Sequence, residues 1–288
     1  MSDIKNVTVL GTGVLGSQIA YQTAYSGFAV TAYDISDEIL AKAKERFEGL
    51  ASTYQADGVA GAADGKADAA LTRIAYSSDL AAAVADADLV IEAIPEVLAL
   101  KQETYEQLGK VAPAKTIFAT NSSTLLPSDL KDFTGRPKKF LALHFANQVW
   151  KFNTAEVMGT ADTDPAVFDE IVAFAGEIGM VAIPIHKEKA GYVLNSLLVP
   201  FLNAGYALAA GGYAEPKDID NVWRIATGAP MGPFQITDII GLTTPYNILS
   251  NAGAEAKPLA DWIKTNYIDK GKLGVATGEG FYSYDTSK

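Results

Sequence analysis

The sequence VTVLGTGVLGSQIAYQTAYSGFAVTAYD, residues 7–34, decides the fold of this chain. The apolar run at residues 7–10 predicts a strand, and the glycine-rich GTGVLG at residues 11–16 follows it at once. The next residues have the composition of a helix, and FAVTAYD after Gly27 predicts a second strand that ends on an acid. Strand, glycine loop, helix, strand and acid in this order are the fingerprint of a dinucleotide-binding βαβ unit.

The glycine loop has a mechanical reason for each of its glycines. Gly11 permits the tight turn, Gly13 lets the backbone approach a pyrophosphate, and Gly16 allows the helix to pack closely on the sheet. Asp34 would accept hydrogen bonds from the adenosine ribose hydroxyls and repel a 2′-phosphate, so we expect NAD rather than NADP as the cofactor. The alternative is a loop that serves only as a turn. The candidate cofactor-binding residues here are Gly11, Gly13, Val14, Leu15, Gly16 and Asp34.

Length and composition limit the possible classes of protein. A chain of 288 residues is long enough for about two domains, and 49% hydrophobic with 20% charged residues is typical of globular proteins. The net charge of −11 argues against nucleic acid or an anionic membrane surface as a partner. With no cysteine and two histidines, we expect neither a disulfide nor a metal site. No apolar run reaches the ~18 residues of a membrane span and no signal peptide precedes the first strand, so we expect a cytoplasmic protein.

Further along the chain, short apolar runs alternate with helical segments. The runs predict strands at residues 74–76, 87–93, 116–120, 140–143, 154–158 and 180–185. Helices are predicted at residues 36–51, 80–84 and 99–108, and the segment 56–70 predicts a loose loop or a short helix pair. We therefore predict an α/β fold, a Rossmann-type mostly parallel sheet with an antiparallel extension at its last two strands.

The charged run HKEKA at residues 186–190 marks the predicted connection between two domains. We expect an NAD-binding Rossmann-like domain over residues 1–186 and an all-α domain over residues 187–288, which takes part in substrate binding and dimerisation. The segment GYVLNSLLVPFLNAGYALAAGG, from Gly191, is apolar on most faces and predicts a helix covered by its neighbours or by a second subunit. Asn195 stands out in it, because a buried amide needs a structural or ligand partner. Further helices are predicted at residues 216–227, 232–240 and 260–268.

His144 is the candidate for proton transfer. It follows the apolar run at residues 140–143, and Glu156 lies in the next extended segment, so the two side chains could face each other. Histidine titrates near neutral pH, with a reference pKa of about 6.5, and a carboxylate beside one ring nitrogen would fix its tautomer. The alternative is a structural histidine with a satisfied hydrogen bond. Its place on the same sheet edge as the glycine loop favours catalysis.

Polar residues follow two other strands. Glu92 and Glu96 end one strand, where ligands of open α/β sheets bind, although either acid could instead stabilise a helix N-terminus. The segment NSST, residues 121–124, ends the next strand, and its hydroxyl and amide groups could cap a helix or bind a ligand.

Taken together, these motifs make the chain resemble the short-chain 3-hydroxyacyl-CoA dehydrogenase family over nearly its full length. The resemblance rests on GTGVLG with Asp34, IEAIPE followed by Lys101, the NSS segment, LHF with Asn147, Glu156, GYVLNSLLVP and TGEGFY.

The resemblance assigns roles to individual residues. It implies that His144 is the catalytic base, paired with Glu156. It implies that Ser123 and Asn195 contact the reacting oxygen or its surroundings and that Asn147 supports the same site. It also implies that Glu96, Lys101 and Ser123 lie beside the cofactor, that the substrate is a small 3-ketoacyl or 3-hydroxyacyl molecule, and that the protein is a homodimer.

Two stretches depart from the family pattern. The segment LASTYQADGVAGAADG carries no cluster of basic residues, where family members that use CoA typically have a lysine-rich helix for its phosphates. The family's HFFNP is HFANQ here, and Trp150 lies close by. These features look more like the diketoreductase branch of the family, which reduces β,δ-diketo esters. The possible functions are thus 3-hydroxyacyl dehydrogenation, diketo ester reduction, or NAD sensing without catalysis.

Overall fold

The structure of this protein is a computed structural model that describes residues 1–284. The chain divides into two compact units, Met1–Val193 and Leu194–Lys288. The first unit is an α/β sheet layered with helices, and the second contains helices without a named strand among its described residues. The predicted fold class, a mostly parallel Rossmann-type sheet with an antiparallel extension and a helical C-terminal part, is confirmed. The expected domain boundary after residue 186 stays a prediction.

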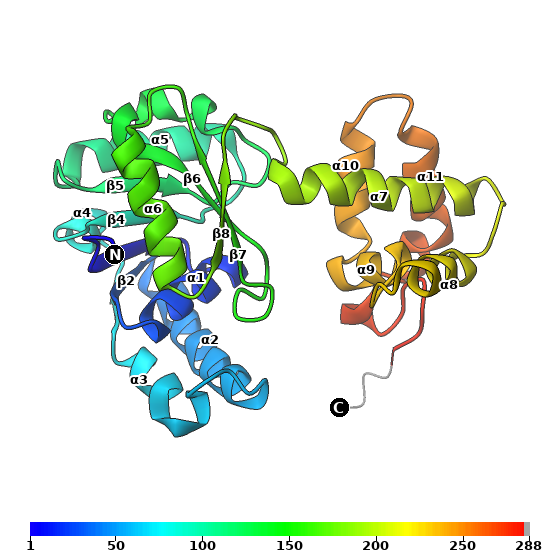
Figure 1. Ribbon diagram of the computed structural model, residues 1–288, viewed down its shortest axis with the longest axis horizontal. Coiled ribbons are helices and arrows are strands. Elements are labelled where there is room, and N and C mark those ends of the chain that lie inside the picture. The colour runs from blue at the N-terminus through cyan, green and yellow to red at the C-terminus, as the bar shows by residue number, and fades with distance from the viewer. Residues whose placement is uncertain (285–288) are drawn as a thin grey trace. The chain divides into compact units, whose positions relative to one another are not determined.

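The sheet of the first unit has eight strands in the order β3-β2-β1-β4-β5-β6-β7-β8 (Figure 1). Neighbouring strands from β3 to β6 pair in parallel, β7 is antiparallel to β6, and β8 is parallel to β7. The strands are β1 (Asn6–Leu10), β2 (Ala29–Tyr33), β3 (Ile74–Ser77), β4 (Leu89–Glu92), β5 (Ile117–Thr120), β6 (Phe140–Phe145), β7 (Thr154–Gly159) and β8 (Val181–Ile185).

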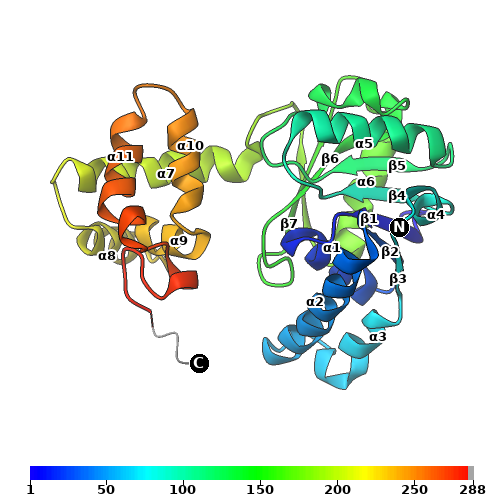
Figure 2. The same cartoon turned by 180° about the vertical axis from the view of Figure 1, so that it is seen from behind.

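Helices cover both faces of this sheet, as the opposite views show (Figures 1 and 2). The helices are α1 (Val14–Tyr25), α2 (Asp37–Ala56), α3 (Ala67–Leu71), α4 (Leu80–Val84), α5 (Leu98–Val111) and α6 (Pro165–Glu177). A π-helical turn, η1 (Ala62–Lys66), precedes α3, and 3₁₀ turns lie at η2 (Pro127–Asp129), η3 (Lys131–Phe133) and η4 (Pro137–Lys139).

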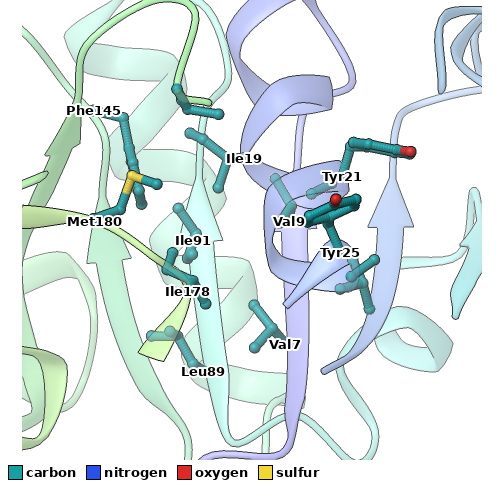
Figure 3. Close-up of a cluster of buried hydrophobic side chains, with 14 of the residues drawn as sticks. Val7, Val9, Ile19, Tyr21, Tyr25, Leu89, Ile91, Phe145, Ile178 and Met180 are labelled. Carbon is teal, nitrogen blue, oxygen red and sulfur yellow. The ribbon is translucent and has the colours of Figure 1, made fainter. Parts of the chain in front are cut away.

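Two apolar clusters hold these layers together. One cluster joins the sheet to α1, α2 and α6, and Figure 3 shows part of it, including Ile19, Ile91 and Ile178. The other lies on the opposite face, where Tyr105 of α5 and Phe140 of β6 pack edge to face with their ring centroids 5.0 Å apart. Burial of this apolar surface is the main force that fixes the sheet and the register of its strands.

Local sequence signals explain where several helices begin and end. The side chains of Ser36, Asp79 and Asp164 accept hydrogen bonds from first-turn amides of α2, α4 and α6. Helix α2 continues to Ala56, five residues beyond its predicted end, because Phe47, Leu50 and Tyr54 extend its buried face. Helix α6 was not predicted, although Asp164 followed by a proline is a start signal.

The second unit holds most of α7 (Tyr192–Ala210), together with α8 (Pro216–Thr227), α9 (Pro233–Ile240), α10 (Thr243–Asn251) and α11 (Lys257–Asn266). The 3₁₀ turns η5 (Ile268–Lys270) and η6 (Val275–Thr277) follow. Helix α10 was not predicted. The buried core of the unit is Leu202, Tyr206, Phe234, Leu242, Leu249, Ala260 and Ile263.

The GEGFYSY segment, residues 278–284, is held to Asp238 of α9 by hydrogen bonds. The carboxylate of Asp238 accepts hydrogen bonds from the backbone amides of Phe281 and Tyr282 at 2.8 and 2.9 Å. The hydroxyl of Tyr284 donates to the same carboxylate at 2.8 Å. A Cβ at Gly280 would lie 2.1 Å from Asp238 Oδ1, so only glycine allows the approach.

Helix α7 is long and apolar enough to cross a membrane by length and composition alone, although core helices of soluble proteins pass the same test. Only 17% of its apolar window is buried within the chain. Part of its apolar surface is therefore exposed, and Leu197 is 69% exposed.

Candidate active site

The candidate site lies at one edge of the sheet, where the parallel strands β1, β2, β4, β5 and β6 end (Figure 1). Strands β1 and β4 are neighbours in the sheet although β2 and β3 lie between them in the sequence, so the direction of the strand order reverses between β1 and β4. Ligands of open α/β sheets bind at such a switch point, in the crevice outside the carboxyl ends of the strands.

The glycine loop fits a dinucleotide. A Cβ at Gly16 would lie 2.0 Å from the carbonyl oxygen of Gly11, so the helix can begin this close to β1 only with glycine. Gly11 has φ of +90°, and a Cβ there would lie 2.6 Å from the carbonyl oxygen of Ala93. A Cβ at Gly13 would meet nothing within 4 Å, because that position faces open space at the N-terminus of α1. This is the side from which a pyrophosphate approaches.

A cleft of about 740 Å³ opens beside this loop. Gly11, Thr12 and Gly13 line it, as do Asp34 after β2 and residues of α2 and α5. The carboxylate of Asp34 accepts hydrogen bonds from Thr12 through its amide at 2.8 Å and its hydroxyl at 2.7 Å. Val14, at the start of α1, is 63% exposed. Leu15 is half-buried against the sheet cluster.

His144 and Glu156 face each other across the antiparallel pair β6 and β7. His144 Nδ1 lies 3.0 Å from Glu156 Oε2, and both side chains are 6% exposed. The other oxygen, Oε1, accepts a hydrogen bond from the backbone amide of Val193 at 2.8 Å. The carboxylate is thereby fixed in orientation and holds one ring nitrogen, so the other nitrogen, Nε2, is free to face the site.

The group at Nε2 is Ser123, whose Oγ lies 3.1 Å away. Ser123 belongs to the loop after β5, and the carboxylate of Glu96 holds this loop in place through hydrogen bonds. One carboxylate oxygen of Glu96 accepts from the amides of Ser123 and Thr124 at 3.0 and 2.9 Å and from the hydroxyls of Ser122 and Thr124. Burial would raise the pKa of Glu96, but these hydrogen bonds and the charge of Lys101 outweigh it and lower that pKa to about 2.

Lys101 is buried under the same loop. Its side chain is 1% exposed, and Nζ lies 2.5 Å from Glu92 Oε1 and 3.3 Å from Glu96 Oε2. Glu92 is fully buried and also accepts hydrogen bonds from Thr120 and Tyr105. Glu92 therefore does not face a ligand directly. Glu92 holds Lys101 in place through their ion pair. Lys101 in turn contacts Glu96 and donates a hydrogen bond to the carbonyl oxygen of Ile94, which lines the cleft.

Asn147 is not part of this relay. Asn147 is exposed, and its Oδ1 accepts hydrogen bonds from Gln18 Nε2 of α1 at 2.8 Å and from the amide of Gln148 at 3.0 Å. It therefore holds the loop after β6 against α1. Asn195 belongs to the second unit, where it is half-buried and lines a cavity with Leu198, Tyr206 and residues of α10.

The structure adds residues that the sequence analysis did not single out. Tyr192 stacks on His144 with ring centroids 4.4 Å apart and an interplanar angle of 19°, and Gly191 and Tyr192 both have positive φ. Arg46 of α2 lines the cofactor cleft. Gly-Tyr after a charged run was a signal for Tyr192, whereas Arg46 lies in an ordinary helical stretch that gave no signal. Among residues 1–284 no group of three His, Cys, Asp or Glu side chains could hold a metal ion.

The fold and the glycine-loop cleft define the class of protein, one that binds a dinucleotide. Two family models match consecutive parts of the chain. The NAD binding domain of 3-hydroxyacyl-CoA dehydrogenase matches residues 6–189, and the C-terminal domain of the same family matches residues 191–284.

Individual relatives are similar over nearly the whole chain. The mitochondrial hydroxyacyl-coenzyme A dehydrogenase of Rattus norvegicus is 36% identical, covering 98% of this chain and 91% of the relative. A probable 3-hydroxybutyryl-CoA dehydrogenase of Bacillus subtilis is 32% identical over 98% of both chains. A solved structure concerning substrate-directed dual catalysis of dicarbonyl compounds by diketoreductase is 66% identical, with a TM-score of 0.96, covering 99% of this chain and 100% of that one.

The chain belongs to the 3-hydroxyacyl-CoA dehydrogenase family. It is an NAD-dependent oxidoreductase that acts on a secondary alcohol or the corresponding ketone.

Proposed function

We propose that this protein interconverts 3-hydroxyacyl and 3-ketoacyl compounds with NAD(H), and that its preferred substrates are small dicarbonyl esters that carry no CoA. The observation that carries the reaction is the continuous relay from Ser123 Oγ through His144 to Glu156, at the sheet edge that also bears the glycine loop. A histidine that acts as a general acid or base is held in one tautomer by such a hydrogen-bonded partner.

In the reducing direction, NADH held at the glycine loop would supply the hydride for the carbonyl carbon. His144, protonated at Nε2, donates that proton to the carbonyl oxygen. Glu156 stabilises the imidazolium through Nδ1 before the transfer. The hydroxyl of Ser123 donates a hydrogen bond to the oxygen as negative charge develops on it. In the oxidising direction, the neutral imidazole of His144 takes the hydroxyl proton.

The preference for substrates without CoA rests on charge. CoA carries phosphate groups, which bind best to lysine or arginine. In the segment 56–70 the single lysine is Lys66, and its Nζ lies over the ring of Tyr25, 4.3 Å from the centroid. The same segment holds three acids, Asp57, Asp64 and Asp68. The likeness to a diketoreductase structure at 66% identity supports the same preference.

A second candidate is a CoA thioester as substrate. It is favoured by the match of both family models and by the named activities of the rat and Bacillus subtilis relatives. On this alternative, basic residues outside the segment 56–70 would have to meet the phosphates.

A comparison of three substrates separates the candidates. NADH oxidation is followed with a free β,δ-diketo ester, with acetoacetyl-CoA and with the acetoacetyl thioester of N-acetylcysteamine, which has the acyl group and the sulfur but no phosphate. We expect kcat/KM to be highest for the diketo ester and similar for the two thioesters. A clear advantage of acetoacetyl-CoA over its phosphate-free analogue would establish CoA recognition. Turnover of none of the three would leave an NAD sensor without catalysis.

A further inference from the structure

The cofactor cleft contains one positively charged side chain among its lining residues, Arg46. Arg46 lies on α2, two helical turns after Ile39, which lines the same cleft. The cleft also contains the carboxylates of Asp34 and Glu103. Arg46 is thus a cation in the same cleft as Asp34, the acid that we expect to bind the adenosine ribose.

Thr12 links the acid and the cation. Its amide and hydroxyl donate to Asp34 Oδ2 at 2.8 and 2.7 Å, while its carbonyl oxygen accepts from Arg46 Nη1. Thr12 is 1% exposed and Ser17 Oγ holds the same carbonyl at 2.8 Å, so the backbone at this point is fixed. The carboxylate of Asp34 and the guanidinium of Arg46 are thus both hydrogen-bonded to Thr12.

The guanidinium of Arg46 has more hydrogen-bond donors than it uses within the protein. It carries five N–H donors in a planar fork that matches the oxygens of a phosphate. Within residues 1–284, the hydrogen bonds of Arg46 comprise the single one to Thr12. The side chain is exposed at the cleft, so the remaining donors face solvent.

The two forms of the cofactor differ only at the adenosine 2′ position. A carboxylate accepts hydrogen bonds from the 2′-hydroxyl of NAD, whereas a nearby arginine accommodates the 2′-phosphate of NADP. We propose that Arg46 is a specificity-determining residue. Its guanidinium is positioned to contact a 2′-phosphate, and the negative charge of Asp34 prevents that phosphate from binding. The preference for NADH then depends on Asp34 alone, and removing its charge opens the cleft to phosphorylated cofactors.

The proposal concerns cofactor recognition and does not depend on which ketone the enzyme reduces. It is therefore tested by binding rather than by turnover. The probes are 5′-AMP and adenosine 2′,5′-bisphosphate, which differ by the 2′-phosphate alone, titrated into the protein by calorimetry. We expect the wild-type protein to bind 5′-AMP more tightly than the bisphosphate.

Asp34→Asn keeps an acceptor oxygen for Thr12 and removes the charge. We expect it to raise affinity for the bisphosphate by at least about tenfold relative to 5′-AMP, and the gain should shrink as salt rises. Adding Arg46→Gln should abolish the gain while leaving affinity for 5′-AMP within about twofold. Lys44→Gln removes a positive charge from the opposite face of α2 and is the matched control that should preserve the gain.

Two results would overturn the proposal. One is a bisphosphate affinity that does not rise in Asp34→Asn although circular dichroism shows a folded protein. The other is a gain that survives in the double variant. If the Asp34 variant does not fold, Arg46→Gln in the wild-type background decides. A selective loss of the residual bisphosphate affinity supports the proposal, and equal effects on both probes refute it.

Discussion

The Oγ atom of Ser123 lies 3.1 Å from Nε2 of His144, although the two residues are 21 positions apart in the sequence. Ser123 lies in the loop after β5, and His144 lies near the end of the neighbouring strand β6. The opposite ring nitrogen of His144 lies 3.0 Å from Glu156. The imidazole is therefore held at both ends, and this arrangement leads to specific expectations for substitutions.

Replacing His144 with glutamine should abolish proton transfer while retaining a polar side chain of similar length. We expect turnover to fall by about 10²–10⁴-fold, because general acid–base catalysis contributes about that much. Binding of NADH, followed by fluorescence, should be unchanged because the glycine loop is untouched. Turnover equal to that of the wild type would refute the role of the pair formed with Glu156.

Ser123→Ala removes the hydroxyl that faces Nε2 of His144. A donor to the developing oxyanion contributes about 10²-fold or more to kcat, so we expect a loss of that order with a smaller change in KM. Ser123→Thr keeps a hydroxyl at the same Cβ and is the matched control. Recovery of part of kcat in the threonine variant would support hydrogen bonding, whereas equal losses in both variants would point to packing.

The pKa of Glu96 makes stability depend on pH in a defined direction. In the folded protein this pKa is about 2, whereas an unfolded glutamate titrates near about 4.3. The ionised form therefore stabilises the fold above about pH 4, and this contribution is lost as the pH falls from about 4 towards 2.

Glu96→Gln tests this expectation. The difference in urea midpoint between wild type and variant should be larger at about pH 6 than at about pH 3, because protonation removes the advantage of the carboxylate. Glu106→Gln, an exposed acid on α5, is the control. A Glu96 difference that does not change with pH would contradict the hydrogen-bonded carboxylate seen here.

Trp150 ties the loop after β6 to the end of α2. Its Nε1 donates to Asp57 Oδ2 at 2.7 Å, and its ring packs 5.2 Å from that of Tyr54. Trp150→Phe keeps a six-membered aromatic ring but loses both the N–H donor and the smaller ring of the indole, so we expect a loss of about 1–2 kcal/mol in thermal or urea unfolding. Trp223→Phe in the second unit removes the same atoms and is the control. A loss no larger than that of the control would contradict a stabilising hydrogen bond to Asp57.

The second unit exposes large apolar side chains, among them Leu197 at 69%, Val222 at 69% and Ile225 at 82%. Large exposed apolar side chains can mark a protein–protein interface, and we expect a homodimer. Light scattering at micromolar concentration measures the mass directly. Ile225→Asp should shift the equilibrium towards monomer, and Val111→Asp in the first unit should not. A monomeric wild-type protein would contradict the prediction.

Much of the fold could be predicted from the sequence because it depends on local patterns. The GTGVLG loop and Asp34 predicted the βαβ unit, since glycine positions and a terminal acid reflect short-range backbone geometry. Ser36 marked the start of α2, but the end of that helix was wrong by five residues, because tertiary packing of Leu50 and Tyr54 extends it. Helices α6 and α10 were missed, and α6 was missed although Val167, Ile171 and Phe174 lie at helical spacing after its start signal.

The site shows the same division. The sequence by itself placed His144 and Glu156 on adjacent extended segments, because a short loop joins them. Only the tertiary structure decided that Glu96 holds the Ser123 loop, that Glu92 is an internal anchor for Lys101, and that Tyr192 stacks on the histidine. It likewise brought Arg46 of α2 into the cleft with Asp34. These contacts join segments distant in the chain, and their geometry follows from how the layers pack, which no local pattern of residues encodes.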